Sequence, residues 1–157
     1  MATTVTAAPL SITFKESIEL TGSERGSSIK SSIESSVTEY LRTIRSIPQT
    51  AFRQVLAFSQ TPLASGDTFD SDLVKYVRIT NLDTTDAVAI GLEFDTDQFI
   101  TFRIPAGMHF MMGSPLNAVH YQVDSAGQPQ RDVVSILARG QGSSDIDIEV
   151  VVGAVAP

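Results

Sequence analysis

The sequence of 157 residues contains no cysteine and no tryptophan. Without cysteine the chain cannot form disulfide bonds, thiolate zinc sites or a cysteine nucleophile. Without tryptophan it lacks a residue that carbohydrate-binding surfaces often use as a stacking platform. There is also no run of about 18 consecutive apolar residues, so we expect no membrane-spanning segment. The first residues show no basic run followed by an apolar stretch, and we therefore expect no signal peptide.

Charge is scarce as well. Only 18% of the residues are charged, whereas average globular chains carry about 25%. The 18 acidic and 11 basic residues give a net charge of −7. Such a chain repels phosphate backbones and anionic lipid surfaces, so we expect it to bind neither nucleic acid nor membranes. Neutral surface is cheap to desolvate, which suits contact with another protein.

Catalytic and metal-binding patterns are sparse. The two histidines, His109 and His120, fall on segments that we predict to be neighbouring strands and could in principle share a metal ion with a carboxylate. Both alternate out of phase with apolar neighbours, so we predict that they point away from the core. No Gly-x-Ser-x-Gly motif and no phosphate-binding glycine loop is present. The sequence thus predicts no enzyme and no cofactor or metal site.

Paired aspartates could in principle perform acid–base chemistry or hold a weak calcium ion. Asp145 and Asp147 alternate along a strand, where side chains two residues apart are expected to be solvated. The remaining candidates fall in predicted loops, where aspartate usually stabilises Asx turns. These candidates are Asp67, Asp70, Asp72, Asp95 and Asp97.

Alternation of apolar and polar residues is the main structural signal. Near the C-terminus, Ile146, Ile148 and Val150 share one face, and the opposite face, with Asp147 and Glu149, is expected to meet water. Further strands are predicted at 12–20, 52–58, 75–80, 88–94, 100–104, 119–123 and 133–138, with 100–104 presenting an inward row of Ile100, Phe102 and Ile104. Turn-forming residues separate these segments at the spacing of a sandwich or barrel. We predict an all-β fold, an antiparallel two-sheet sandwich that is jelly-roll-like.

The N-terminal part of the chain shows a less regular pattern. Residues 1–9, rich in Ala and Thr, are predicted to form a flexible N-terminal arm, and 10–157 a single sandwich domain. Within it, apolar residues in 23–47 recur at helical spacing but also fit one face of a strand. Serine is abundant there and competes for backbone hydrogen bonds inside helices. We therefore interpret 23–36 as a loop or irregular edge strand and 37–47 as a strand, with a short helix as the alternative.

Three residues are the candidates for an interface. Tyr76 and Arg78 project from the face opposite Val77 and Ile79. If that face is the outer one, an aromatic residue and an arginine are good contact residues; if it packs on the second sheet, Tyr76 is core and Arg78 lies at the rim. Met111 is the third candidate, because it alternates out of the row of Met108, Phe110 and Met112 that we predict to fill the core.

One set of motifs resembles a known class. The order 74–83 (VKYVRITNLD), then 87–92 (AVAIGL), then 99–107 (FITFRIPAG) is similar to that of small structural proteins of tailed bacteriophages, including capsid decoration (cement) and tail-associated proteins. The resemblance covers about residues 37–152. It implies a β-sandwich located in the virion, without catalytic activity, that contacts the major capsid protein or other virion proteins. It also implies a homo-oligomer, with a trimer suspected.

The leading hypothesis is therefore a capsid decoration protein that stabilises a shell through protein–protein contacts. A neck, tail or baseplate component is the alternative within the same class. A carbohydrate-binding module on the particle surface is an alternative from another class, and it would require exposed aromatic residues in a shallow groove.

Overall fold

The chain folds into two facing β-sheets, as the sequence predicts. The computed structural model describes residues 8–17, 19–24, 26–59, 68–70, 73–94, 99–113, 120–121 and 131–155. All regular elements in this part of the chain are strands. No helix among the described residues is long and apolar enough to cross a membrane.

Sheet I contains five strands in the order β1-β4-β13-β7-β10, and all its neighbours are antiparallel. The strands are β1 (Ala8–Lys15), β4 (Ser28–Ile47), β13 (Ile146–Val155), β7 (Val74–Asn81) and β10 (His109–Gly113).

Sheet II has the order β6-β5-β12-β8-β9, with β11 paired to β12 beside this path. Only the pair of β5 with β6 is parallel among the described pairs. The strands are β6 (Thr68–Phe69), β5 (Arg53–Phe58), β12 (Arg131–Gly140), β8 (Val88–Phe94), β9 (Phe99–Ile104) and β11 (His120–Tyr121).

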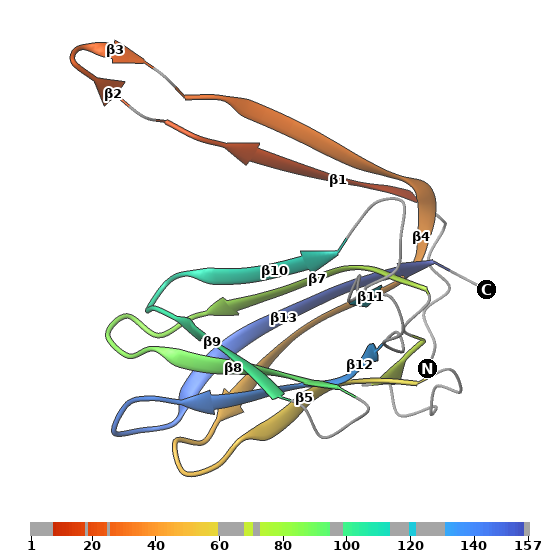
Figure 1. The fold of residues 1–157 in the computed structure, drawn as a ribbon, viewed down its shortest axis with the longest axis vertical. Coiled ribbons are helices and arrows are strands. Elements are labelled where there is room, and N and C mark those ends of the chain that lie inside the picture. Colours follow the sequence, from red (N-terminus) through yellow and green to blue (C-terminus); the bar gives the residue numbers. More distant parts are fainter. Residues whose placement is uncertain are drawn as a thin grey trace, which may run out of the picture.

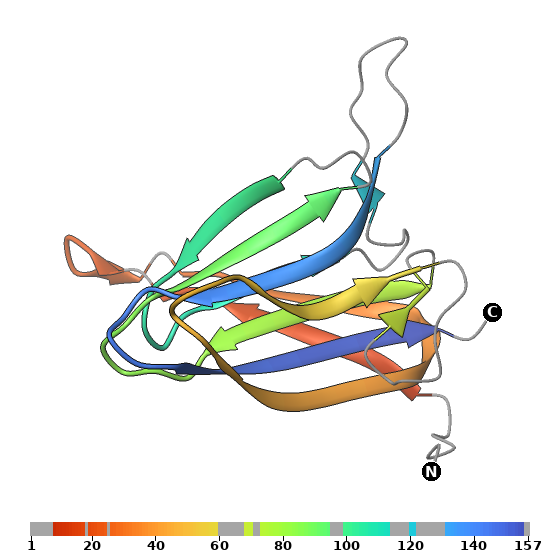
Figure 2. The same ribbon diagram turned by 90° about the horizontal axis from the view of Figure 1, so that it is seen from below.

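The connections between the sheets define a jelly roll. Strands β4, β13, β7 and β10 lie in one sheet and β5, β12, β8 and β9 in the other. Along the chain these strands alternate between the sheets except for β8 and β9, which form a hairpin in sheet II. In Figure 1 the two sheets overlap, and Figure 2, seen from below, shows them one above the other. The predicted antiparallel, jelly-roll-like sandwich is confirmed.

The core lies between the sheets and is mainly aliphatic, with Phe58, Phe69 and Phe94 among its buried members. Its fully buried members come from both sheets, as the alternation predicts for the inner faces of a sandwich. The largest of them are Ile47, Leu56, Ile79, Ile90, Ile136, Ile146, Ile148, Val55, Val74, Val77 and Val88. The inward direction predicted for Val77, Ile79, Ile146 and Ile148 is confirmed.

A β-ribbon projects from this sandwich. We call it the β-arm; it consists of β1, β2 (Glu19–Leu20), β3 (Ser23–Glu24) and the part of β4 before Val37. The first part of β4 pairs with β1 and the second part with β13, and Val37 pairs with both neighbours. Figure 1 shows the β-arm leaving the sheet I side of the molecule, with β2 and β3 at its tip.

The β-arm corrects one prediction. The segment 23–36, interpreted as a loop or irregular edge strand, contains the short strand β3 and then the regular start of β4, which continues without a break to Ile47. The strand predicted over 37–47 is confirmed, and the alternative helix is wrong. Cross-strand pairing with β1 holds the segment from Ser28 onward in an extended conformation, and such tertiary pairing outweighs a weak helical pattern. Ala8 and Pro9 belong to β1, whereas residues 1–7 of the predicted flexible arm lie outside the described residues.

The inward direction predicted for Ile100 and Phe102 is confirmed, because they lie opposite the core residues Leu92 and Ile90. Phe102 packs against Phe110 with ring centroids 5.3 Å apart, and both predicted residues stay about 40% exposed because β9 is the last strand of sheet II. The expectation that Glu149 faces water is wrong, since it is buried to 8% exposure under two arginines. Alternation assigns a residue to a face but does not say what covers that face. Of the strand predicted at 119–123, only His120 and Tyr121 are described.

Candidate interaction surface

The structure brings the three predicted interface residues together on the outer face of sheet I. Residues directly opposite each other on antiparallel strands share a face. Arg78 on β7 lies opposite Met111 on β10 and opposite Val151 on β13. Tyr76 lies one pair along the same face, beside Gly153. The outer-face alternative for Tyr76 and Arg78 therefore holds, since Val77 and Ile79 fill the core.

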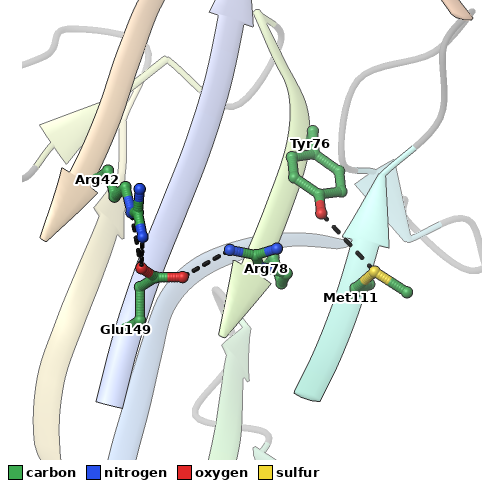
Figure 3. Close-up of polar contacts among 5 residues, drawn as sticks. All are labelled: Arg42, Tyr76, Arg78, Met111 and Glu149. Carbon is green, nitrogen blue, oxygen red and sulfur yellow. Dashed lines mark hydrogen bonds and ion pairs between the residues drawn. The ribbon is translucent and has the colours of Figure 1, made fainter. Parts of the chain in front are cut away.

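A three-residue ion cluster crosses this face. Arg42 on β4 contacts one carboxylate oxygen of Glu149 at 2.7 Å, and Arg78 contacts the other at 2.6 Å (Figure 3). The hydrogen bond from Arg42 is the main reason that the pKa of Glu149 lies below its ordinary value; Arg78 acts in the same direction and desolvation opposes both. Two guanidinium groups on one carboxylate leave the cluster with one net positive charge. The cluster ties β4, β13 and β7 together.

Tyr76 forms the second polar contact of this face. Its hydroxyl donates a hydrogen bond to the sulfur of Met111, with an oxygen–sulfur distance of 3.7 Å (Figure 3). Burial raises the pKa of Tyr76, and the positive charge of Arg78 opposes that shift. The hydroxyl thus remains a neutral donor to the thioether at neutral pH.

The base of the β-arm covers part of the same face. Val37, Tyr76 and Val151 form a second, smaller hydrophobic cluster, against which Leu10, Ile12 and Met111 pack. Leu10 and Ile12 come from β1, so the β-arm shields Tyr76 from solvent. Tyr76 therefore acts within the molecule as an anchor for the β-arm, whereas Arg78 keeps a side chain that is 36% exposed. Met111 is half-buried between them.

The remaining methionines divide between two environments. Phe110 and Met112 pack against the main core, as predicted. Met108, predicted to belong to the same row, is exposed, because it precedes β10 in the turn that follows Gly107. The outward direction of Met111 relative to this row is confirmed.

The structure separates the two histidines. His109 lies on β10 in sheet I and is exposed. His120 lies on β11, which pairs with β12 beside sheet II. The prediction of neighbouring strands is therefore wrong, because β10 belongs to sheet I and β11 pairs with a strand of sheet II. In the described parts of the chain, no group of three or more His, Asp or Glu residues is arranged to hold a metal ion.

Three aspartates in the described part of the chain have structural or solvent-facing positions. Asp83 accepts hydrogen bonds from the backbone N–H groups of Thr85 and Asp86, each at 2.7 Å. These bonds, that from Asp86 first, lower the pKa of Asp83. Asp145 and Asp147 are exposed, as predicted. The predicted candidates Asp67, Asp72, Asp95 and Asp97 lie outside the described residues.

Sequence reasoning missed a second surface, on the outer face of sheet II. The rings of Phe52 and Phe99 meet edge to face with centroids 5.0 Å apart, and the guanidinium carbon of Arg139 lies 4.8 Å from the Phe52 centroid. The ring of Phe99 lies over Gly91, where a Cβ atom would overlap it. The only signal in the sequence was a glycine inside a strand pattern, which marks a close approach but does not name the neighbour.

Comparison with known proteins gives no function for these surfaces, because no family model, no curated protein and no solved structure matches the chain.

Proposed function

We propose that the protein is a non-catalytic structural component of a bacteriophage virion, and specifically a decoration or cement protein that stabilises the capsid shell. Its partners in this proposal are the major capsid protein or other virion proteins and further copies of itself, with a trimer as the suspected oligomer. The phage assignment is supported by the motif resemblance within 74–107 and by a jelly-roll body of the kind that the resemblance implies.

The β-arm is the observation that carries the contact function. A two-stranded ribbon is only marginally stable in water by itself. The base of this one is packed against sheet I, but further out Phe14 and Ile29, which pair with each other, are 41% and 61% exposed. An assembly partner that covers these side chains would supply the missing packing. A projecting ribbon with uncovered apolar residues thus fits a protein that joins a lattice.

The proposal is tested with shells of the major capsid protein encoded in the same genome. Purified full-length protein is mixed with these shells and sedimented, and the heat stability of the shells is measured with and without it. We expect saturable co-sedimentation and a higher disruption temperature. Binding to isolated tails but not to shells would favour the neck, tail or baseplate alternative, and binding to neither would overturn the proposal.

A control variant separates specific binding from aggregation. Phe14→Ser together with Ile29→Ser removes the exposed apolar pair of the β-arm and leaves the core of the sandwich unchanged. We expect this variant to fold but to bind shells more weakly. Saturable binding to immobilised glycans by a monomer, without binding to shells, would instead favour the carbohydrate-binding alternative.

A further inference from the structure

β9, the last strand of sheet II, has the features of an exposed edge strand. β9 pairs with β8 on one side, and no other described strand pairs with it. Phe99, Ile100 and Phe102 are 40–42% exposed and alternate between the two faces of the strand. Proteins usually protect such edges with charge, proline or a covering element, because an open apolar edge pairs with other chains. One edge of β9 is therefore available for pairing with another strand.

The outer face beside β9 is positively charged, although the chain as a whole is acidic. We define the basic aromatic face by Phe52, Phe99, Arg103 and Arg139, which lie on the outer side of sheet II. Arg103 is exposed and Arg139 is half-buried, and Arg103 donates a hydrogen bond to Gln141 at 3.1 Å.

Few acidic side chains in the described part of sheet II offset these arginines. Among the described side chains of the sheet II strands, the only acidic group is Glu93, which accepts a hydrogen bond from Ser135. The basic aromatic face therefore favours an acidic partner.

The tip of the β-arm is acidic, in contrast to the basic aromatic face. The register of β2 and β3 places Glu19 directly opposite Glu24, and like charges in directly opposed positions destabilise a strand pair. Glu16, just before β2, is also exposed. Lys15 and Lys30 lie in the ribbon behind the tip. Among the described residues of the tip there is no basic side chain, so an external cation would relieve the repulsion between Glu19 and Glu24.

The β-arm cannot pair with β9 of its own chain. It leaves the molecule on the sheet I side, whereas β9 belongs to sheet II on the other side of the core (Figure 1). A β1 strand of eight residues spans about 26 Å at roughly 3.3 Å per residue, which is long enough to reach a neighbouring molecule. The occupant that combines a β-ribbon, exposed apolar residues and an acidic tip is the β-arm of a second copy.

We propose that the β-arm of one copy binds along β9 of a second copy, with its acidic tip on the basic aromatic face. Backbone pairing extends sheet II by β-augmentation, Phe14 and Ile29 cover the apolar edge, and Arg103 and Arg139 neutralise the glutamates. The two surfaces differ, so the contact is head-to-tail and leads to a closed ring or an open chain. This inference rests on the proposed function because it describes how the chain binds one of the proposed partners, a further copy of itself.

Two charge-reversal variants of the full chain test the contact by sedimentation velocity at several protein concentrations. The tip variant is Glu19→Lys with Glu24→Lys, and the face variant is Arg103→Glu with Arg139→Glu. We expect wild type to self-associate and each variant alone to do so at least about tenfold more weakly. An equimolar mixture should recover association, because each reversed surface then meets its opposite charge.

Matched controls change charge elsewhere on sheet I. Glu39→Lys and Ser46→Glu are exposed positions outside both surfaces, and they should leave association unchanged. A wild-type chain that stays monomeric, association that survives both reversals, or a mixture that fails to recover would each overturn the inference. Circular dichroism establishes that every variant is folded.

A second measurement keeps the test decisive if a charge variant does not fold. Since the chain has no cysteine, Glu19→Cys and Arg103→Cys proteins can be mixed and treated with a flexible bismaleimide. We expect a covalent heterodimer from this mixture and none when Glu39→Cys replaces Glu19→Cys; equal yields would overturn the contact. Protein that binds shells without self-association would overturn this inference alone, and self-association without shell binding would overturn only the proposed function.

Discussion

Tyr76 and Gly153 lie directly opposite each other on β7 and β13, and the missing side chain of Gly153 makes room for the β-arm. A Cβ atom at Gly153 would lie 3.4 Å from Cδ2 of Leu10 and 3.8 Å from Cβ of Tyr76. Leu10 therefore rests above the glycine while Tyr76 supports it from the side. This contact sets where the β-arm meets the sandwich.

Enlarging Gly153 should detach the base of the β-arm. Gly153→Leu fills the space that Leu10 uses, and overpacking of this kind costs about 1–3 kcal/mol. We expect faster tryptic cleavage at Lys15 and Lys30 in the β-arm. Gly153→Ala is the matched control, because its methyl group fits at ordinary contact distance. Equal cleavage of the leucine variant and wild type would show that Leu10 does not hold the arm.

Asn81 should be among the most sensitive polar residues. It is fully buried, and its amide nitrogen lies 2.8 Å from the carbonyl oxygen of Asp86 and 3.2–3.3 Å from those of Pro105 and Ile104. Asn81→Ala leaves these carbonyls without their donor, and we expect a loss of about 3 kcal/mol in the free energy of urea unfolding. Leu82→Ala, exposed in the same turn, should change it by less than about 0.5 kcal/mol. Similar values for the two variants would contradict this role.

The ion cluster should make stability depend on pH. Because the folded-state pKa of Glu149 is lowered, its contribution is present above the unfolded-state pKa of about 4.5 and is lost as the pH falls through the lowered value. We expect Glu149→Gln to reduce the urea midpoint at neutral pH, with a difference that shrinks under acid. Asp147→Asn, on the same face but exposed, is the control. A difference that is independent of pH would show that ionisation of Glu149 is not responsible.

Met111 and Met112 should respond differently to the same substitution. Met111 packs against the small cluster outside sheet I, whereas Met112 packs against the main core. We expect Met111→Asp to cost about 1–2 kcal/mol for a poorly partnered polar group, to leave the sandwich folded, and to weaken shell binding. Met112→Asp should cost clearly more. Thermal unfolding followed by circular dichroism measures both, and an unfolded Met111→Asp protein would mean that this residue belongs to the essential core.

Several parts of the fold could be predicted because alternation reports them directly. Val88, Ile90, Leu92 and Phe94 are all buried as expected. The turn after β7 was recognisable from Asn81 and Asp83, whose side chains accept backbone hydrogen bonds two residues further on. These features depend on neighbours in sequence, and local rules describe them well.

The candidate surface could be predicted only in part. Tyr76, Arg78 and Met111 share one face, but nothing local indicated that Glu149, about seventy residues later, would join Arg78. Nothing local in the sequence indicated that β1 would cover Tyr76 either. Both facts depend on which strands become neighbours, and pairing across long stretches of chain leaves no local periodic trace.

The sequence by itself determined that this protein is built from strands with one apolar face each, because side chains switch sides at every residue of an extended chain. It also determined that few charges and no cysteine would be available. Only the tertiary structure decided which outer faces are covered, which strand remains an open edge and where the β-arm leaves the body. Those outcomes follow from the strand order, which brings together residues that the sequence keeps far apart.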